Sequence, residues 1–467
     1  MSDTSPDPET ETEAEADENE DVYALDSARV EAILKAVEAE DHAQLIALLE
    51  PLHAADRADL LEQIGRDERR ELVRVWGEDF DGDVLSELEE GVRDEVLELL
   101  EPEVLAHAVQ ELETDDLVYL VEDMEEPRKA EFLGALEDTD RVAVEASLQY
   151  DEDTAGRLMS RSMVICPPHW TVGEAIDYMR AHEDLPDLFY KVILVDARMH
   201  VAGTVMLSSI MANRREVKLL DLADTNPRLI PVDQSNEDVA YAFNQYHLVS
   251  AAVVDADERL VGVITIDDAM EVLQDETEED MKRLAGLGDE ELSDTVIDTA
   301  KARFPWLAVN LVTAILASLV IAIFEATIQA VVALAVLMPI VASMGGNAAT
   351  QTLTVAVRAL ATRDLTPANA WRIIRRETLV GFGNGLAFAV IVGVVGQVWF
   401  GSWLLAGVLA AAMVINLLVA GIAGILIPMA LDRAGADPAL ASGTFVTTVT
   451  DVVGFFAFLG LAAAFLL

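Results

Sequence analysis

The last 25 residues of the chain, GTFVTTVTDVVGFFAFLGLAAAFLL, are apolar enough to cross a bilayer and yet contain a carboxylate, Asp451. A charge inside a membrane helix costs roughly 2.5–3.5 kcal/mol on insertion scales, and no Lys or Arg lies deep in an apolar segment to pair with it. Thr444, Thr447 and Thr448 precede Asp451 on the same helical face, at positions i, i+3, i+4 and i+7. The pattern favours a carboxylate that faces a cation or a hydrated cavity.

A second polar face arises from SMGGNAATQTLT, which begins at Ser343. Helical spacing puts its amides and hydroxyls on one side, and the Gly345-Gly346 pair permits close packing or a break that exposes backbone carbonyls. Small and hydroxyl residues usually serve packing in membrane helices, so neither face alone is decisive. Two such faces and an unpaired carboxylate together predict a hydrophilic pathway. Its predicted lining residues are Asn347, Thr350, Gln351, Thr447 and Thr448.

The available ligand types indicate which cation would pass. All seven histidines precede residue 250, and Cys166 is the single cysteine. The apolar part therefore offers carboxylate, amide, hydroxyl and backbone oxygens, which suit hard cations. Mg²⁺ keeps several waters and needs few carboxylates, so one Asp451 from each of two symmetry-related chains would suffice to hold a hydrated ion. Ca²⁺ is expected to need more direct oxygen ligands.

Four apolar stretches must position these side chains: residues 306–324, 327–357 and 378–431 carry no charge, and residues 443–467 carry only Asp451. A bilayer helix needs about 20 residues, so the third stretch provides two spans and the total is five transmembrane helices. Of the carboxylates, only Glu325 and Asp451 are expected within or at the edge of a span. The eight Lys and Arg residues after residue 300 share one side if the N-terminus is cytoplasmic. The C-terminus then lies outside.

The rest of the chain is strongly acidic. Residues 1–300 carry 23 basic and 78 acidic side chains, a net charge of −55, and the remaining residues carry +2, which together give the net charge of −53. With only six lysines, this composition resembles halophilic proteins, whose high-salt cytosol screens the repulsion between carboxylates. The single cysteine fits a reducing cytoplasm. Residues 1–25 are acidic and polar, which predicts a disordered tail rather than a signal peptide.

Two folded regions precede the apolar part. Apolar residues recur at helical spacing over residues 26–150, which predicts a small α-helical superhelical domain. Residues 155–274 contain a repeat, because ILVDARMHVAGTVMLSSIM and AVVDADERLVGVITIDDAM align with Gly203 and Gly262 in the same place. This β-α-β-β-α repeat resembles a pair of CBS domains. Residues 275–303 predict a charged, amphipathic connecting helix.

The CBS resemblance also implies a weak nucleotide site. The second repeat keeps Thr265 and Asp268 in the T-x-x-D position that such domains use on an adenosine ribose, whereas the first has Met206 and Ser209 there. At most one site for ATP is therefore expected per chain. An equally good interpretation is that Asp268 simply caps the helix that follows.

Three motifs resemble those of MgtE-type magnesium channels: MGGNAATQ at 344–351, RALATRDL at 358–365 and DPALASGTFVTTVTDVVG at 437–454. The order of segments is also similar over nearly the whole chain. The resemblance implies a multidomain fold with an α-helical superhelical N-terminal domain, tandem α/β CBS domains, a connecting (plug) helix and an all-α pore domain of five transmembrane helices at 304–467.

The resemblance further implies a homodimeric, Mg²⁺-selective channel of the cell membrane, which Mg²⁺ closes by binding to the cytosolic domains. Asp451 would hold a hydrated Mg²⁺ in the pore and Asp437 would lie near its cytoplasmic mouth. Clustered carboxylates repel one another when free, so that Mg²⁺ would pull the domains together and act as a switch. The implied sensor residues are Asp83, Asp115, Glu237, Asp268, Glu276, Glu279 and Asp280.

The chain departs from the family pattern in three places. Thr444 stands where the family commonly has Pro, and Tyr119 and His247 stand where a relative offers an acid, so the sensor is expected to hold fewer ions. The first alternative is a transporter of Mn²⁺, Co²⁺ or Ca²⁺ on the same scaffold. The second is a membrane-anchored adenine-nucleotide sensor, which leaves Asp451 unexplained. The sequence has no nucleophile–base set, Walker loop or zinc spacing, so an enzyme is not expected.

Overall fold

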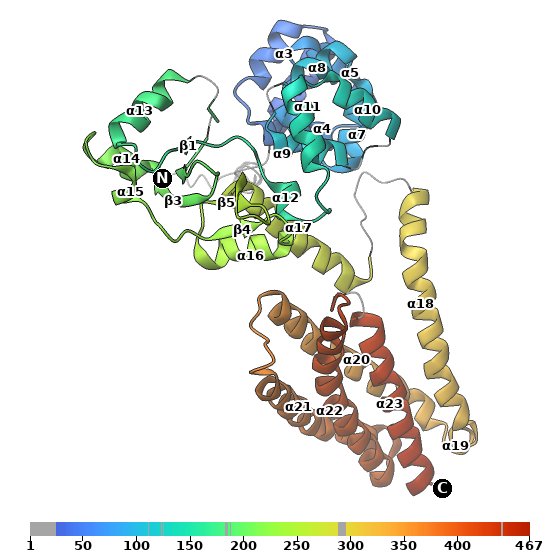
Figure 1. Cartoon of the computed structure of the whole chain (residues 1–467). Helices are drawn as coiled ribbons and strands as arrows, with labels where there is room; N and C mark the ends of the chain where they lie inside the picture. Colours follow the sequence, from blue (N-terminus) through green and yellow to red (C-terminus); the bar gives the residue numbers. More distant parts are fainter. Residues whose placement is uncertain are drawn as a thin grey trace, which may run out of the picture. The chain divides into compact units, whose positions relative to one another are not determined.

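The computed structural model describes residues 25–110, 112–122, 124, 126–182, 185–186, 188–287, 296–439 and 442–467. The chain divides into two compact units, one up to Leu273 and the other from Gln274. Figure 1 colours them from blue to yellow-green and from yellow to red. The predicted tail, apart from Leu25, and residues 288–295 of the predicted connector lie outside the described residues.

The first unit begins with a stack of short helices. Asp26 and Asp41 cap the first two, since their carboxylates accept hydrogen bonds from Ala28 N at 2.9 Å and Gln44 N at 3.1 Å. Trp76 is almost fully buried in their common core. The helices are α2 Ser27–Glu38, α3 His42–Leu49, α4 Ala54–Gln63, α5 Arg66–Trp76, the 3₁₀ helix η1 Gly77–Asp79, α6 Asp83–Ser86, α7 Glu90–Leu99, α8 Pro102–Ala108, α9 Thr114–Glu122, α10 Glu126–Ala135 and α11 Asp138–Ser147.

Two small mixed sheets follow, and they confirm the predicted repeat. In each sheet the first strand is parallel to the second and the second is antiparallel to the third. Gly203 pairs with Leu194 and Gly262 with Val253, at equivalent positions. The elements are α12 Ala155–Leu158, β1 Ile165–Cys166, α13 Val172–Ala181, β2 Lys191–Val195, β3 Val201–Met206, α14 Leu207–Ala212, α15 Leu219–Leu222, β4 Leu229–Pro231, α16 Asn236–Tyr246, β5 Ser250–Val254 and β6 Leu260–Thr265.

Helix α17, Ile266–Ala285, starts in the first unit and ends in the second. Five helices of the second unit are long and apolar enough to cross a membrane, as predicted. Among them, α22 is the most buried and packs against α20, α21 and α23. The helices are α18 Val296–Ile323, the short α19 Glu325–Ala330, α20 Ala333–Ala361, α21 Ala370–Phe400, α22 Trp403–Ala434 and α23 Ser442–Phe465.

One expectation about carboxylates needs correction. Helix α21 begins at Ala370 rather than near Thr378 and α22 runs on to Ala434, so Glu377 and, near the end of α22, Asp432 also lie within candidate spans. The Glu377 side chain is buried and its Oε1 accepts a hydrogen bond from Arg376 Nη2 at 2.8 Å. The adjacent guanidinium of Arg376 compensates the charge of Glu377. The sequence pattern missed this pair because the predicted span was taken to begin only after the last charged residue. The predicted fold class is otherwise confirmed.

Candidate functional site

The unpaired carboxylate of the sequence lies on α23. Asp451 is partly buried, and among the residues that the structure describes none forms an ion pair or a hydrogen bond with its carboxylate. The second unit thus holds a carboxylate within a candidate span that the described protein groups do not neutralise. Such a group needs water or a cation from outside the chain.

The threonines before Asp451 present oxygen acceptors. Thr447 Oγ1 donates to Gly443 O at 2.7 Å, and Thr448 Oγ1 donates to Thr444 O at 2.5 Å. Each of these hydroxyl protons is therefore used within α23, while the lone pairs stay available. A face of hydroxyl oxygens can accept hydrogen bonds from the waters of a hydrated cation.

The polar face of α20 adjoins the one on α23. A Cβ atom added at Gly346 would lie 3.6 Å from Thr447 Cγ2, so the two helices approach closely there. The other polar residues of α20 are exposed on this single chain, although they belong to a candidate span. Exposing polar side chains to lipid costs free energy, so we expect this face of α20 to contact protein or water instead. The exposed residues are Ser343, Asn347, Thr350, Gln351 and Thr354.

A group of acids in the first unit, here called the acidic cluster, joins three predicted sensor residues to two that were missed. Asp83 starts α6, Asp115 and Asp116 lie in the first turn of α9, and Asp268 lies in the first turn of α17. Their charges act on one another. The two missed acids directly flank Thr114 and Asp115 in the sequence, which is the signal that could have found them. The cluster comprises Asp83, Glu113, Asp115, Asp116 and Asp268.

Burial and mutual repulsion raise the pKa values in the acidic cluster. Burial first, and then the charges of Asp268, Glu113 and Asp83, raise the pKa of Asp116 to about 6. Burial and the charge of Asp268 hold the pKa of Asp115 well above its usual range. The cluster therefore binds protons, or another positive charge, more readily than isolated carboxylates do.

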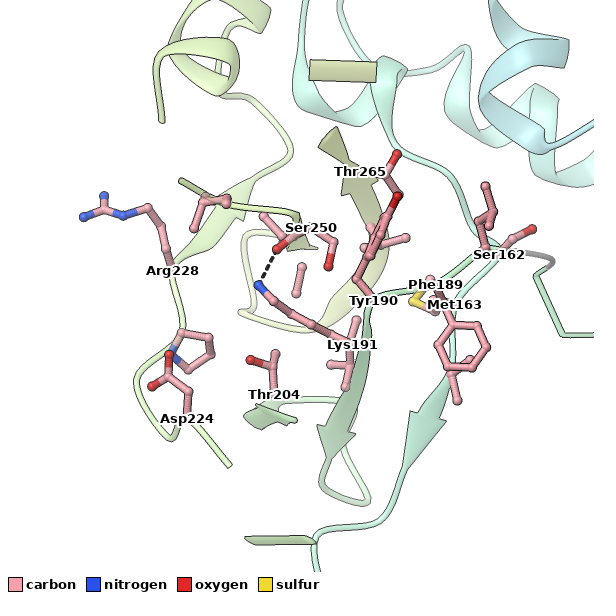
Figure 2. A pocket seen from close by; sticks show the side chains of 18 residues that line it. Ser162, Met163, Phe189, Tyr190, Lys191, Thr204, Asp224, Arg228, Ser250 and Thr265 are labelled. Carbon is pink, nitrogen blue, oxygen red and sulfur yellow. Dashed lines mark hydrogen bonds between the residues drawn. The ribbon is translucent and has the colours of Figure 1, made fainter. Parts of the chain in front are cut away.

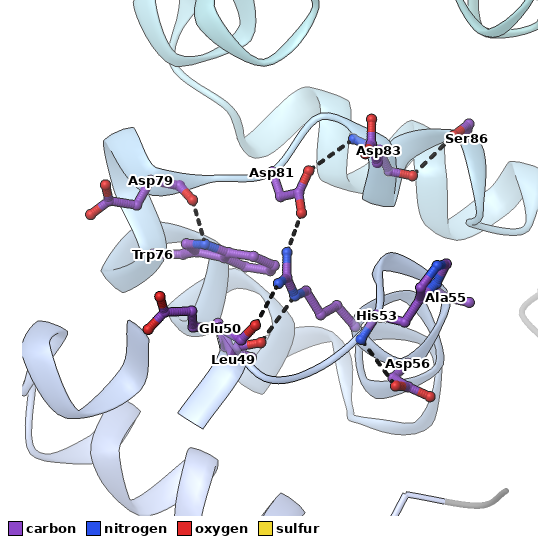
Figure 3. A network of polar contacts seen from close by, with 11 residues as sticks. Leu49, Glu50, His53, Ala55, Asp56, Trp76, Asp79, Asp81, Asp83 and Ser86 are labelled. Atoms are coloured by element: carbon purple, nitrogen blue, oxygen red, sulfur yellow. Dashed lines mark hydrogen bonds and ion pairs between the residues drawn. The ribbon is translucent and has the colours of Figure 1, made fainter. Parts of the chain in front are cut away.

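The loop before α6 fixes the position of Asp83, as Figure 3 shows. Arg57 forms an ion pair with Asp81, and its Nε donates to Leu49 O at 3.1 Å. Asp81 Oδ1 in turn accepts from Asp83 N at 3.1 Å, and Ser86 Oγ donates to Asp83 O at 2.9 Å. The backbone of Asp83 is thus held from both sides.

The connector acids are placed on α17, with a basic partner that the sequence analysis missed. Arg283 pairs with Glu279 one turn earlier, and its Nη1 lies 2.5 Å from Asp437 Oδ2. Leu284 packs beside this pair against the apolar cluster that includes Ala439 and Val446. The end of α17 therefore docks near the start of α23. The other two predicted connector residues, Glu276 and Asp280, lie earlier on the same helix.

Thr265, but not Asp268, lines a pocket between the two sheets (Figure 2). Asp268 Oδ2 instead accepts from Thr265 N at 3.0 Å and from Thr265 Oγ1 at 2.8 Å, which is the capping contact weighed above. Lys191 Nζ, which also lines the pocket, donates to Ser250 O at 2.7 Å. With Arg228, the pocket offers two cationic side chains to an anionic ligand.

A direct metal cage is not found in the described residues, because no group of three or more His, Cys, Asp or Glu side chains there could hold an ion. Glu237 lies exposed at the start of α16 and makes no polar contact with a described residue. In the acidic cluster, Asp115 Oδ1 is buried without a hydrogen-bond partner among the described residues.

Comparison with known families matches three parts of the chain. The family model of MgtE, described as a divalent cation transporter, matches residues 338–461. The model of the MgtE intracellular N domain matches residues 52–153. The CBS domain model matches residues 155–216 and 219–275.

Individual relatives show similarity over most of the chain. The magnesium transporter MgtE of Enterococcus faecalis is 33% identical over 319 residues, which are 68% of this chain and 70% of the relative. The magnesium transporter MgtE of Bacillus subtilis is 31% identical over 72% of this chain and 74% of the relative. A crystal structure of the cytosolic domain of the Mg²⁺ channel MgtE in complex with ATP covers 52% of this chain and 99% of its own, with 25% identity and a TM-score of 0.49.

Proposed function

The chain belongs to the MgtE family of divalent cation transporters, and from this premise we propose that it carries Mg²⁺ across the cell membrane through a pathway lined by α20 and α23. The family comprises transporters rather than enzymes, and the five candidate spans make this chain a multi-pass membrane protein. The observation that carries the proposal is Asp451, a carboxylate within a span that no described residue pairs.

Asp451 holds the hydrated ion in this proposal, and the polar faces bind its water. The hydroxyl oxygens of Thr447, Thr448 and Thr350 accept hydrogen bonds from waters of the ion. The amides of Asn347 and Gln351 complete the lining. Few direct ligands are needed because Mg²⁺ dehydrates reluctantly.

Two copies of the chain form the pathway. Support comes from the exposed polar face of α20, which a second chain would cover, and from the single Asp451 in each chain. The cytosolic parts precede the pore and the C-terminus lies outside, in line with the cationic residues. The division that we propose is a tail at 1–25, a helical domain at 26–150, CBS domains at 155–274, a connecting helix at 275–303 and a pore domain at 304–467.

Mg²⁺ on the cytosolic side closes the pathway. The acidic cluster binds a hydrated ion because burial, and then mutual repulsion that a cation relieves, raise the pKa values of Asp115 and Asp116. The acids of α17, Glu276, Glu279 and Asp280, together with Asp437 and Glu237, are the remaining regulatory ligands. The pocket at Thr265 is the place where ATP would act on the switch.

The proposal is tested by Mg²⁺ uptake into proteoliposomes that contain the full chain, with Mn²⁺, Co²⁺ and Ca²⁺ as competitors. We expect uptake above that of empty vesicles, stronger competition by Mg²⁺ than by the other cations, and inhibition by Mg²⁺ on the side of the cytosolic domains. Preferential uptake of another cation would favour the alternative substrate. No uptake of any divalent cation would favour a membrane-anchored sensor.

A further inference from the structure

A buried amide lies in the middle of the membrane part, outside both polar faces. Asn416 of α22 is completely buried, and the apolar residues one turn away on either side, Ala412, Met413 and Ala420, are buried with it. Its Nδ2 donates to Val341 O of α20 at 2.8 Å. Its Oδ1 is buried too and has no hydrogen-bond partner among the described residues.

Two glycines make the space that this amide occupies. A Cβ atom added at Gly345 of α20 would lie 2.1 Å from Asn416 Nδ2, and one added at Gly454 of α23 would lie 2.7 Å from the same atom. Gly345 is two residues before Asn347 on the polar helix α20. Gly454 is three residues after Asp451, so the amide contacts α23 about one turn from the pore carboxylate.

Packing alone does not explain an asparagine at this position. A leucine has the same branched shape and number of side-chain heavy atoms, and it would leave no unsatisfied acceptor in an apolar environment, where an unmade hydrogen bond destabilises the fold. Polar side chains inside membranes are usually functional for this reason. The free acceptor lies between Gly345 of α20 and Gly454 of α23, the two helices that carry the polar faces.

We propose that Asn416 is a positioning residue of the transport pathway. Its amide fixes α20 against α23 near the level of Asp451, and its Oδ1 accepts a hydrogen bond from water that accompanies the ion. The inference rests on the proposed transport of Mg²⁺ and adds a residue that touches neither polar face.

The test compares Mg²⁺ uptake by the full-length wild type and by Asn416→Leu, which keeps the branched shape of the side chain but removes both polar atoms. We expect the half-saturating Mg²⁺ concentration to rise at least fivefold with little change in the melting temperature. Loss of folded protein would lower only the maximal rate. Gln397→Leu is the matched control, since Gln397 Oε1 of α21 is also buried without a described partner, but α21 carries neither polar face.

A second variant separates hydrogen bonding from space filling. The double substitution Gly345→Ala with Asn416→Ala refills the space without an amide, so we expect normal stability and a persistent rise in half-saturation. Wild-type half-saturation in Asn416→Leu or in the double variant overturns the inference, as does an equal rise in Gln397→Leu. Wild-type transport by Asp451→Asn would contradict the proposed function instead, which keeps the two failures distinguishable.

Discussion

At the scale of single residues, the account depends on carboxylates that lack a protein cation. Asp451 has no described partner, and Asp115 Oδ1 is buried without one. Both oxygens would be costly if water or a cation did not reach them. The same reasoning separates them from Glu377, whose charge the neighbouring Arg376 compensates.

Asp116→Asn should remove a pH dependence of stability. The pKa of Asp116 is raised to about 6, so the folded state binds a proton more tightly than the unfolded state. The resulting contribution to stability is present at pH 4 and is lost as pH rises through 6. At pH 7.5 the variant should therefore be more stable than the wild type by roughly 1–3 kcal/mol, measured by thermal unfolding of the full chain.

The two proteins should converge only as the pH falls below about 4, where Asp116 is protonated in the folded and the unfolded state alike. Mg²⁺ should also stabilise the wild type at pH 7.5 more than it stabilises Asp116→Asn, because the cation relieves the same repulsion. If the stability of both proteins depended on pH in the same way, the pKa of Asp116 would not be raised in the folded state.

At the scale of elements, the C-terminal end of α17 is the segment that we expect to control opening of the pathway. Arg283→Gln removes the ion pair between α17 and Asp437, which lies in the connection between α22 and α23. We expect a weaker closed state and about two- to fivefold more Mg²⁺ uptake at inhibitory cytosolic-side Mg²⁺, since partly exposed pairs contribute about 1 kcal/mol or less. Lys282→Gln is the control, because Lys282 forms an ion pair at 2.9 Å with Glu278, one turn earlier on α17 itself. Equal effects of both substitutions would contradict a role for the contact.

Gly82→Ala tests how α6 is held. A Cβ atom at Gly82 would lie 2.0 Å from Ala108 O, so α8 would have to move and Asp83 with it. We expect a loss of roughly 1–3 kcal/mol in unfolding free energy and weaker Mg²⁺ stabilisation. Gly134→Ala of α10 has open space around it and should be neutral or slightly stabilising. If Gly82→Ala were as stable as the wild type, the backbone of α8 at Ala108 would not restrict the space beside Gly82.

The elements were more predictable than the contacts between them. Apolar periodicity predicted the helical region that begins with α2 and α3, and the shared place of Gly203 and Gly262 predicted the repeat that forms the two sheets, because these signals are local. Long-range pairs such as Arg283 with Asp437 leave no local pattern, since 154 positions separate their residues. Asn416 was missed for a related reason: one amide in an apolar run carries no periodicity.

At the scale of the whole molecule, the net charge of −53 predicts a dependence on salt. Exposed carboxylates repel one another, and the Debye length falls from about 10 Å at 0.1 M to about 3 Å at 1 M salt. We expect the melting temperature of the full chain to rise by several degrees between 0.1 and 1 M KCl. A flat or falling curve, with sucrose as the uncharged control, would contradict screening as a source of stability.

The central claim, that Mg²⁺ crosses the membrane past Asp451, is tested most directly by one flux measurement. Asp451→Asn keeps the shape of the side chain and removes its charge. Initial rates of Mg²⁺ uptake into proteoliposomes, at matched amounts of folded wild-type and variant protein, should differ at least tenfold. Equal rates would show that the ion does not depend on this carboxylate, and that Asp451 has a structural role.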